Sequence, residues 1–243
     1  MNRIIKIARK STLIIVVMVV LLLCLFVLLA FITNVPTAIT TKDVVVFKDD
    51  LNLTELQHPQ TFADEIRAIK MIQHRVFDKA PFGAGIPDYE PREPYDLIKK
   101  REGLCFDRSR TLDKAFDFIG LPVRHVYLLY LHDRSFLGAL SHYGQRSHAV
   151  TEVKTSKGWM FVDSNMEWIA LTRDGQVVNA DDVWKRASEF DAMPTYLNEP
   201  WVAIRGMYSR RGQLYPPYIM FPDFNWMDYF SWLIRDRLLK DDK

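Results

Sequence analysis

A continuous apolar segment near the N-terminus constrains this chain more than any other feature. Every residue from Leu13 to Ile32 is apolar, about the length that an α-helix needs to cross the hydrocarbon core of a membrane. Four basic side chains precede the segment, and no acidic residue occurs before Pro36. The positive-inside rule therefore predicts a cytoplasmic N-terminus and a periplasmic or extracellular position for the remainder.

A cleaved signal peptide is the alternative interpretation of this segment. Signal peptides usually have a shorter apolar region, followed by a small-x-small cleavage site. Residues 34–38 read Asn-Val-Pro-Thr-Ala, which is a poor cleavage site. We therefore expect an uncleaved transmembrane anchor over 11–33, preceded by a cytoplasmic basic flank over 1–10.

The roughly 200 residues that follow are enough for one domain with a substantial core. Hydrophobic residues make up 49% of the chain and charged residues 26%, which is a globular composition. Four of the 32 basic side chains lie in the N-terminal flank, so 28 remain against 30 acidic ones. A nearly neutral domain has no electrostatic footprint for nucleic acid. We interpret the local cluster of Arg205, Arg210 and Arg211 as a solvated loop rather than an anion site.

The chain has two cysteines, of which Cys24 lies in the apolar segment and Cys105 is alone in the rest. The domain therefore cannot form an internal disulfide, although an extracytoplasmic compartment would permit one. An unpaired thiol in an oxidising compartment is a liability unless it is buried or used. Cys105 is either a structural core residue or a reactive group.

We expect a linker and a short edge strand over 34–60, because Val44–Phe47 is a brief β-branched run. The domain then occupies 61–243. Thr61 can cap a helix over about 62–78, whose apolar residues recur at near-helical spacing. A loop rich in proline and glycine follows over 80–94, and then a short helix over 95–100.

Residues 103–162 define the expected fold class. A helical pattern follows Cys105 and ends at Gly120, which is placed as a C-cap. Three β-prone runs come next, at 123–131, 147–153 and 159–162, and the last two are joined by a tight turn. One helix followed by an antiparallel meander indicates an α+β domain with the helix packed on the sheet.

Two further helices are expected towards the C-terminus. Residues 179–190 have Trp184 and Phe190 on one apolar side. Residues 225–240 combine aromatic and charged side chains, as in helices that lie at a membrane interface. Because acidic residues on its polar face do not suit anionic lipid, we expect the second helix to dock on its own domain.

A catalytic thiol needs a base, an orienter for that base and positive potential nearby. Cys105 lies at the expected junction between a loop and the N-terminus of a helix, so the helix dipole favours its thiolate and can stabilise an oxyanion. His148 lies on one expected strand and Asp163 ends the next strand of the same hairpin. A carboxylate–imidazole hydrogen bond is therefore geometrically reasonable.

These residues carry a family resemblance. The chain shows Gly-Leu-Cys-Phe-Asp at 103–107, Gly-Leu-Pro-Val-Arg at 120–124, His148-Ala149, Gly158-Trp159 and Asp163, in that order. This pattern resembles the transglutaminase-like superfamily, including its bacterial, papain-like cysteine protease branch. The spacings of 43 residues from Cys105 to His148 and 15 from His148 to Asp163 are typical of it.

The resemblance implies a papain-like core and a catalytic triad of Cys105, His148 and Asp163. It implies a cysteine hydrolase or acyltransferase that acts through an acyl-enzyme on a protein or peptide of the cell envelope. Two features depart from the family pattern: Val150 follows His148-Ala149 where tryptophan is frequent, and the helix after Cys105 is unusually charged. A second oxyanion donor cannot be assigned, although Tyr89 and Tyr95 lie in a suitable upstream loop.

Other functions remain open at this point. A catalytically silent binding or assembly module, for example in a surface-polysaccharide system, could keep the same fold. A zinc site is the rival chemistry, but the cysteine and histidines show no short metal-binding spacing. No calcium-binding loop is apparent, so we expect no metal and no cofactor. The side chains that could supply zinc ligands are Cys105, His125, His132, His142 and His148.

Overall fold

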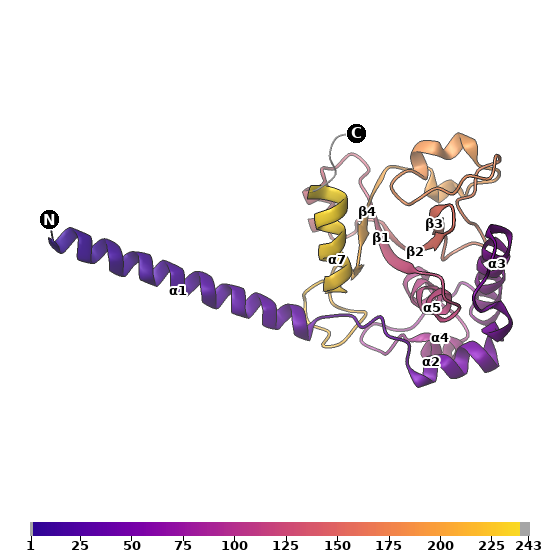
Figure 1. Cartoon of the computed structure of the whole chain (residues 1–243), viewed down its shortest axis with the longest axis horizontal. Helices are drawn as coiled ribbons and strands as arrows, with labels where there is room; N and C mark the ends of the chain where they lie inside the picture. Colours follow the sequence, from indigo (N-terminus) through magenta and orange to yellow (C-terminus); the bar gives the residue numbers. More distant parts are fainter. Residues whose placement is uncertain (1, 239–243) are drawn as a thin grey trace. The chain divides into compact units, whose positions relative to one another are not determined.

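The computed structural model describes residues 2–238, and the chain divides into two compact units after Asn34. The first unit is the single helix α1 (Asn2–Ile32) (Figure 1). Within it, Thr12–Ile32 is long and apolar enough to cross a membrane, judged by length and composition. The chain therefore carries one N-terminal apolar helix that could serve as a membrane span or signal anchor.

The second unit mixes helices with antiparallel strands. Its elements, in chain order, are α2 (Thr41–Val45), the π-helix η1 (Val46–Asp50), the 3₁₀ helix η2 (Leu53–Leu56), α3 (Phe62–Lys79), α4 (Pro94–Lys100), α5 (Cys105–Phe118), β1 (Val123–Tyr130), α6 (Phe136–Ser141), β2 (Ser147–Thr155), β3 (Gly158–Val162), the 3₁₀ helices η3 (Trp184–Glu189) and η4 (Thr195–Leu197), β4 (Trp201–Arg205), β5 (Met207–Ser209), β6 (Asp223–Phe224), α7 (Trp226–Trp232) and the π-helix η5 (Leu233–Leu238).

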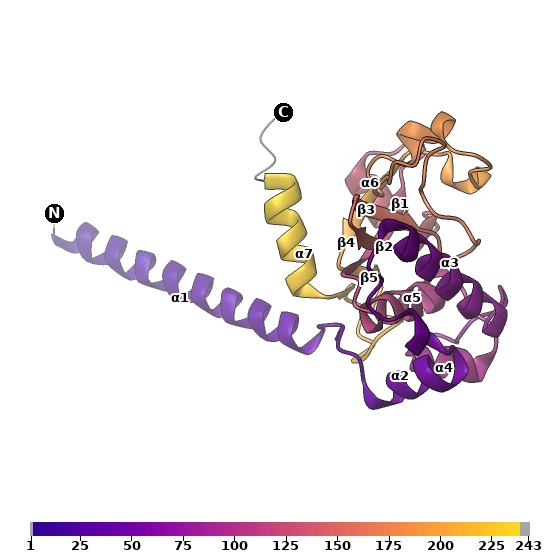
Figure 2. The same cartoon turned by 45° about the vertical axis from the view of Figure 1, so that its right-hand side comes forward.

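The main sheet has four antiparallel strands in the order β3-β2-β1-β4. Strands β1, β2 and β3 form the expected meander, and β4 returns from later in the chain to pair with β1. Helix α5 packs against β1 and β2, and α3 lies beside α5 (Figures 1 and 2). The α+β class and the helix-on-sheet arrangement are therefore confirmed.

Helix α5 ends at Phe118 because of hydrogen bonds made by Gly120 and Leu121. At its C-terminus, Gly120 adopts a φ of +88°. Its N–H donates to the carbonyl oxygen of Asp117, and the N–H of Leu121 donates to that of Phe116. This pair of hydrogen bonds is the Schellman motif, which favours glycine because a side chain is disfavoured at that φ. The expected cap at Gly120 is confirmed.

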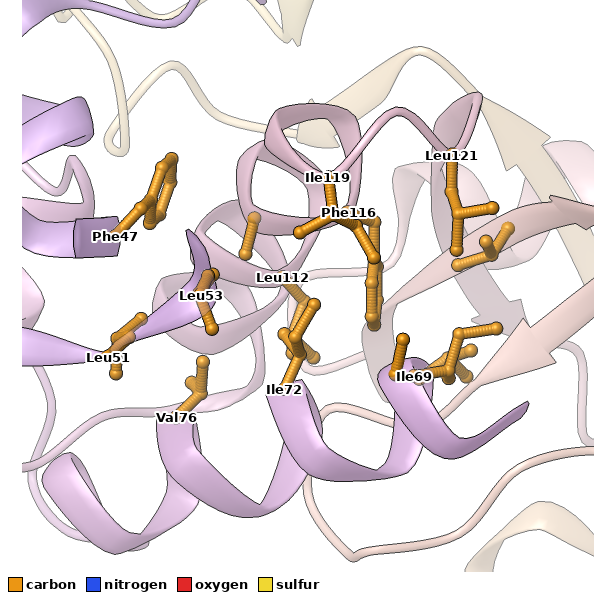
Figure 3. Close-up of a cluster of buried hydrophobic side chains, with 14 of the residues drawn as sticks. Phe47, Leu51, Leu53, Ile69, Ile72, Val76, Leu112, Phe116, Ile119 and Leu121 are labelled. Carbon is orange, nitrogen blue, oxygen red and sulfur yellow. The ribbon is translucent and has the colours of Figure 1, made fainter. Parts of the chain in front are cut away.

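The main hydrophobic core lies between α3, α5 and the sheet. Side chains of α3 point towards those of α5, with Ile72 facing Leu112 and Phe116 (Figure 3). These three side chains are fully buried, and each such burial contributes about 1.5–3 kcal/mol relative to exposure. The segment before α3 adds Phe47, Leu51 and Leu53 to the same cluster. The helix that begins at Cys105 is thus held by packing on two sides.

The expected edge strand at Val44–Phe47 is wrong, because these residues are helical in α2 and η1. Thr40 and Asp43 form a capping box, in which the Asp43 N–H donates to Thr40 Oγ1 and the Thr40 N–H donates to Asp43 Oδ2. The resulting helix buries Val46 and Phe47 in the core. Capping and burial outweigh the β preference of branched side chains.

The two C-terminal expectations are met in part. Of the helix expected over 179–190, only the 3₁₀ helix η3 forms. The backbone of Ala180 is used by tertiary contacts instead, since its N–H donates to Glu152 and its carbonyl accepts from Trp201 Nε1. The aromatic helix exists as α7 and η5, and Trp226 contacts Phe224 of β6 with ring centroids 4.7 Å apart. Its last expected residues, 239 and 240, lie outside the described residues.

Candidate active site

Cys105 is the first residue of α5, and the residues around it explain that placement. Leu104 is extended at the N-cap, and its N–H donates to Asp107 Oδ2 at 2.9 Å. A Cβ on Gly103 would lie 2.6 Å from Leu97 Cδ1, so the close approach to α4 favours glycine. The sharp entry into the helix leaves the Cys105 side chain partly exposed at the positive end of the helix dipole.

The acid two residues after Cys105 holds this entry together. Asp107 and Arg92 are both fully buried and form an ion pair with an Oδ1–Nη1 distance of 2.6 Å. The same carboxylate accepts the N–H of Ile86 at 3.3 Å. Asp107 therefore ties the loop before α4 to the start of α5 and has a positioning role rather than a place beside the thiol.

The charges along α5, which depart from the family pattern, also have partners. Lys114 pairs with Asp43 and with Glu93, each at 2.7 Å. Arg110 pairs with Glu93 at 2.9 Å. These pairs attach α5 to α2 and to the start of α4. Since Lys114 and Arg110 are buried, the helix keeps an ionic core on one side and an apolar core on the other.

His148 and Asp163 meet at the end of the β2–β3 hairpin. The ladder between β2 and β3 ends at the pair Thr151–Val162, and the two residues lie just beyond it. His148 Nε2 and Asp163 Oδ1 are 2.6 Å apart, and both side chains are buried. The hairpin thus brings together the imidazole and the carboxylate that the sequence predicts to be partners.

The Asp163 carboxylate is fixed by further donors. It accepts the backbone N–H groups of Asn165 at 3.2 Å and Met166 at 3.1 Å. The hydroxyl of Tyr196 donates to Oδ2. From α3, the Gln73 amide donates to the carbonyl oxygen of Asp163 at 2.7 Å. A carboxylate with this many donors has one orientation towards the imidazole.

The thiol and the imidazole shift each other's protonation. Burial opposes ionisation of the thiol, but the His148 imidazole and the backbone amides of Ala149 and Phe106 outweigh it and lower the pKa of Cys105. Burial also favours a neutral imidazole, but the hydrogen bond to Asp163 and the contact with Cys105 raise the pKa of His148 to about 9. Both shifts favour a thiolate beside an imidazolium at neutral pH.

Two further side chains lie next to the candidate triad and were not predicted as its neighbours. The ring of Tyr196 contacts that of His148 edge-on, with centroids 5.6 Å apart. One helical turn after Cys105, Arg108 donates to Asn165 Oδ1 at 2.7 Å, and its charge interacts with those of Cys105 and Asp163. The i,i+3 spacing on α5 could have indicated that Arg108 lies near Cys105. The contact of Arg108 with Asn165 and the place of Tyr196 depend on segments distant in the sequence.

Cys105 opens into a small cleft of about 210 Å³. Neither Tyr89 nor Tyr95 lines this cleft, so no second oxyanion donor emerges from them. Phe106, Tyr127, Tyr143 and Tyr208 line it together with several polar side chains, namely Asp88, Ser147, Ser209, Arg210, Arg211 and Gln213. The cleft therefore combines an aromatic lining with polar and charged groups around the thiol.

The interpretation of Arg205, Arg210 and Arg211 as one solvated loop is wrong. Arg205 is buried, and it pairs with Glu152 at 3.1 Å and with Asp181 at 2.7 Å. Arg210 and Arg211 are only partly exposed and lie in the cleft with Cys105. The three arginines are close in the sequence, but the turn between β4 and β5 separates them. Arg205 lies in the interior, whereas Arg210 and Arg211 lie in the cleft.

Residues 55–164 match the model of the transglutaminase-like superfamily. The domain is transglutaminase-like. Among solved structures, one described as the crystal structure of a TGase is similar at 16% identity and a TM-score of 0.35, covering 56% of this chain and 36% of that one. The chain thus spans about a third of that structure. No curated protein matches the chain.

The matched segment of the transglutaminase-like domain contains Cys105, His148 and Asp163. Their catalytic roles remain a prediction, which the short distance between His148 and Asp163 supports. Of the other residues that could supply zinc ligands, His125 is 2.7 Å from Asp113 and its ring stacks on Tyr208. Over residues 2–238, no group of three or more His, Cys, Asp or Glu side chains is arranged to hold a metal ion.

Proposed function

We propose that this protein is a thiol enzyme, a cysteine hydrolase or acyltransferase, that forms an acyl-enzyme at Cys105 on a protein or peptide substrate. The observation that carries the proposal is the position of His148, which is 2.6 Å from Asp163 and interacts with the Cys105 thiol at the start of α5. A base, an orienting carboxylate and a helix amino end are the features that activate a thiol.

In the acylation step, the Cys105 thiolate attacks the carbonyl carbon of an amide or ester and forms a C–S bond. The carbonyl electron pair moves to oxygen, where the N–H groups at the start of α5 stabilise the negative charge. When the intermediate collapses, the bond to the leaving group breaks and the His148 imidazolium gives that group its proton. A thioester and a neutral imidazole remain.

In the deacylation step, water or an amine attacks the thioester, and neutral His148 accepts the proton that the nucleophile loses. The C–S bond then breaks, and the thiolate returns beside an imidazolium. Asp163 keeps its hydrogen bond to the ring and holds the ring in one orientation throughout. Water as the nucleophile gives hydrolysis, and an amine gives acyl transfer.

Acetylation by p-nitrophenyl acetate tests the proposal without knowledge of the natural substrate. We expect a burst of p-nitrophenolate, followed by slow turnover, because thioester formation precedes its hydrolysis. Trypsin releases Glu102–Arg108, which contains Cys105 as its only cysteine, so mass spectrometry can locate the acetyl group. Cys105→Ala should abolish the burst, whereas Cys24→Ala should retain it.

Acetylation that spares Glu102–Arg108, or a burst that persists in Cys105→Ala, would remove the thiol enzyme from consideration. The domain would then be better described as a non-catalytic binding or assembly module of the cell envelope. The same peptide assay therefore separates the two functional classes.

We further propose that α1 anchors the enzyme and that its domain acts outside the cytoplasm. The apolar span of α1 and the basic residues before it support this topology. Alkaline phosphatase fused after residue 60 should be active in a bacterial host, because this enzyme folds only outside the cytoplasm. An inactive fusion alongside an active cytoplasmic reporter fused at the same position would reverse the topology.

A further inference from the structure

Two consecutive arginines form a wall of the cleft that contains Cys105. Arg210 and Arg211 follow β5 directly, and both line this cleft. Arg210 also lines a larger apolar cavity of about 950 Å³ between α6, β4 and α7. Two positively charged side chains therefore share a cleft with the Cys105 thiol.

The hydrogen bonds of both guanidinium groups, within the described part of the chain, go to uncharged oxygens. Arg210 donates to the hydroxyl of Tyr127 at 2.9 Å and to the carbonyl oxygens of Leu140, His142 and Gln145 at 2.9–3.1 Å. A longer contact of 3.4 Å reaches the carbonyl of Ala139.

Arg211 donates to the carbonyl oxygen of Tyr143 and lies 3.8 Å from the centroid of its ring. Neither arginine has a carboxylate partner over residues 2–238, so carbonyl dipoles orient two positive charges without neutralising them.

The backbone holds this pair in place. Ser209 Oγ accepts the N–H groups of Arg211 at 3.4 Å and Gly212 at 3.1 Å, and the Ser209 hydroxyl donates to buried Asp223. Gly212 has a φ of +65°, and a Cβ there would lie 1.7 Å from the carbonyl oxygen of Ile219. The loop after β5 therefore packs against a neighbouring segment, which limits the movement of the two arginines.

One acid also lines the cleft. Asp88 is exposed and accepts from the Gln213 side chain at 3.4 Å. It offsets one of the two arginine charges and leaves the wall net positive. Because charges in a partly buried cleft interact more strongly than in bulk water, an anionic substituent is favoured beside Arg210 and Arg211 and disfavoured beside Asp88.

We propose that Arg210 and Arg211 form a subsite for a carboxylate of the acyl substrate, next to the carbonyl that Cys105 attacks. The substrate class is thus an acidic peptide or an acyl group that carries a free carboxylate. This inference rests on the proposed function, since it specifies the substrate of the same site. Arg211 is the main contact, because the donors of Arg210 already hold the segment around α6.

Alkylation by two reagents of similar size but different charge tests the subsite. In both iodoacetate and iodoacetamide, the thiolate displaces iodide and forms a thioether. We would measure both rate constants on Glu102–Arg108 of the full chain in non-ionic detergent. The ratio of the iodoacetate rate to the iodoacetamide rate reports the charge of the cleft, whereas the iodoacetamide rate alone reports activation of the thiol.

We expect Arg211→Gln to lower this ratio by about three- to tenfold, the effect of one charge at an intermediate effective dielectric constant. Arg211→Lys should restore most of the ratio, because it keeps the charge but loses the stacking on Tyr143. Arg67→Gln, which removes an exposed positive charge on α3, controls for net charge and should leave the ratio unchanged. High salt should reduce the wild-type ratio.

An equal ratio in wild type, Arg211→Gln and the charge reversal Arg211→Glu would overturn the subsite, even if Cys105 reacts rapidly. A thiol that reacts at an ordinary rate but still loses its preference for iodoacetate in Arg211→Gln would support the subsite and count against the proposed nucleophile. The two hypotheses are therefore distinguishable in one experiment.

Discussion

His148→Ala is expected to slow alkylation of Cys105 by iodoacetamide about 10- to 100-fold at pH 6.5. An ordinary thiol has a pKa of about 8.5, so roughly 1% of it is thiolate at that pH. In the wild type, His148 lowers the pKa of Cys105 and keeps a larger thiolate fraction. The effect stays below the full 100-fold because a more acidic thiol gives a weaker nucleophile.

The measurement is the rate of alkylation from pH 5 to 10, followed on Glu102–Arg108. The wild-type rate should rise at a lower pH than that of His148→Ala. His125→Ala is the matched control, because His125 also pairs with a buried carboxylate, at 2.7 Å, but does not line the Cys105 cleft. Coincident profiles for wild type and His148→Ala would show that the imidazole does not activate the thiol.

Glu152→Ala is expected to lower the free energy of unfolding by about 3–5 kcal/mol, the usual cost of breaking a buried ion pair from one side. Glu152 is fully buried and contacts Arg205 at 3.1 Å and Arg124 at 2.5 Å. It also accepts the N–H of Ala180 at 2.6 Å. Without the Glu152 carboxylate, buried Arg205 keeps its ion pair with Asp181 but loses the one with Glu152. The N–H of Ala180 also loses its hydrogen-bond acceptor.

Urea denaturation of the full chain in detergent micelles, followed by tryptophan fluorescence, measures this loss. Glu189→Ala is the matched control, since it removes a glutamate that pairs with Arg186 at 2.6 Å on the surface. Its urea midpoint should equal that of the wild type, because exposed ion pairs contribute little. Equal midpoints for Glu152→Ala and Glu189→Ala would show that the buried pair is not stabilising.

The same pair predicts how stability depends on pH. Burial alone would raise the pKa of Glu152, but Arg205 and Arg124 outweigh it and lower that pKa. A depressed carboxyl pKa stabilises the fold above the unfolded value of about 4.3, and the stabilisation is lost as the pH falls through the folded value. The difference in the free energy of unfolding between wild type and Glu152→Ala should therefore become smaller as the pH falls below about 4.3.

Much of the candidate site could be predicted because its signals are local or come in a fixed order. Asp107 marks the start of α5 through its hydrogen bond to the N–H of Leu104, and Gly120 marks its end through its hydrogen bond to the carbonyl of Asp117. The turn after β2 sets the hairpin that carries His148 and Asp163. In each case the residues that determine the conformation are neighbours in the chain, so their pattern can be read directly.

The environment of the site could not be predicted in this way. Tyr196 donates to Asp163 from 33 residues away, and Arg211 enters the cleft from more than 100 residues beyond Cys105. Val44–Phe47 is helical despite its β preference, because the helix is capped and buries Phe47 in the core.

The sequence by itself therefore determined the apolar N-terminal helix, the α+β class and the order of thiol, imidazole and carboxylate along the chain. Only the tertiary structure decided which charges are buried in pairs and which line the cleft. The physical reason is that helix caps and turns depend on neighbouring residues, whereas burial and ion pairing depend on which distant segments the fold brings into contact.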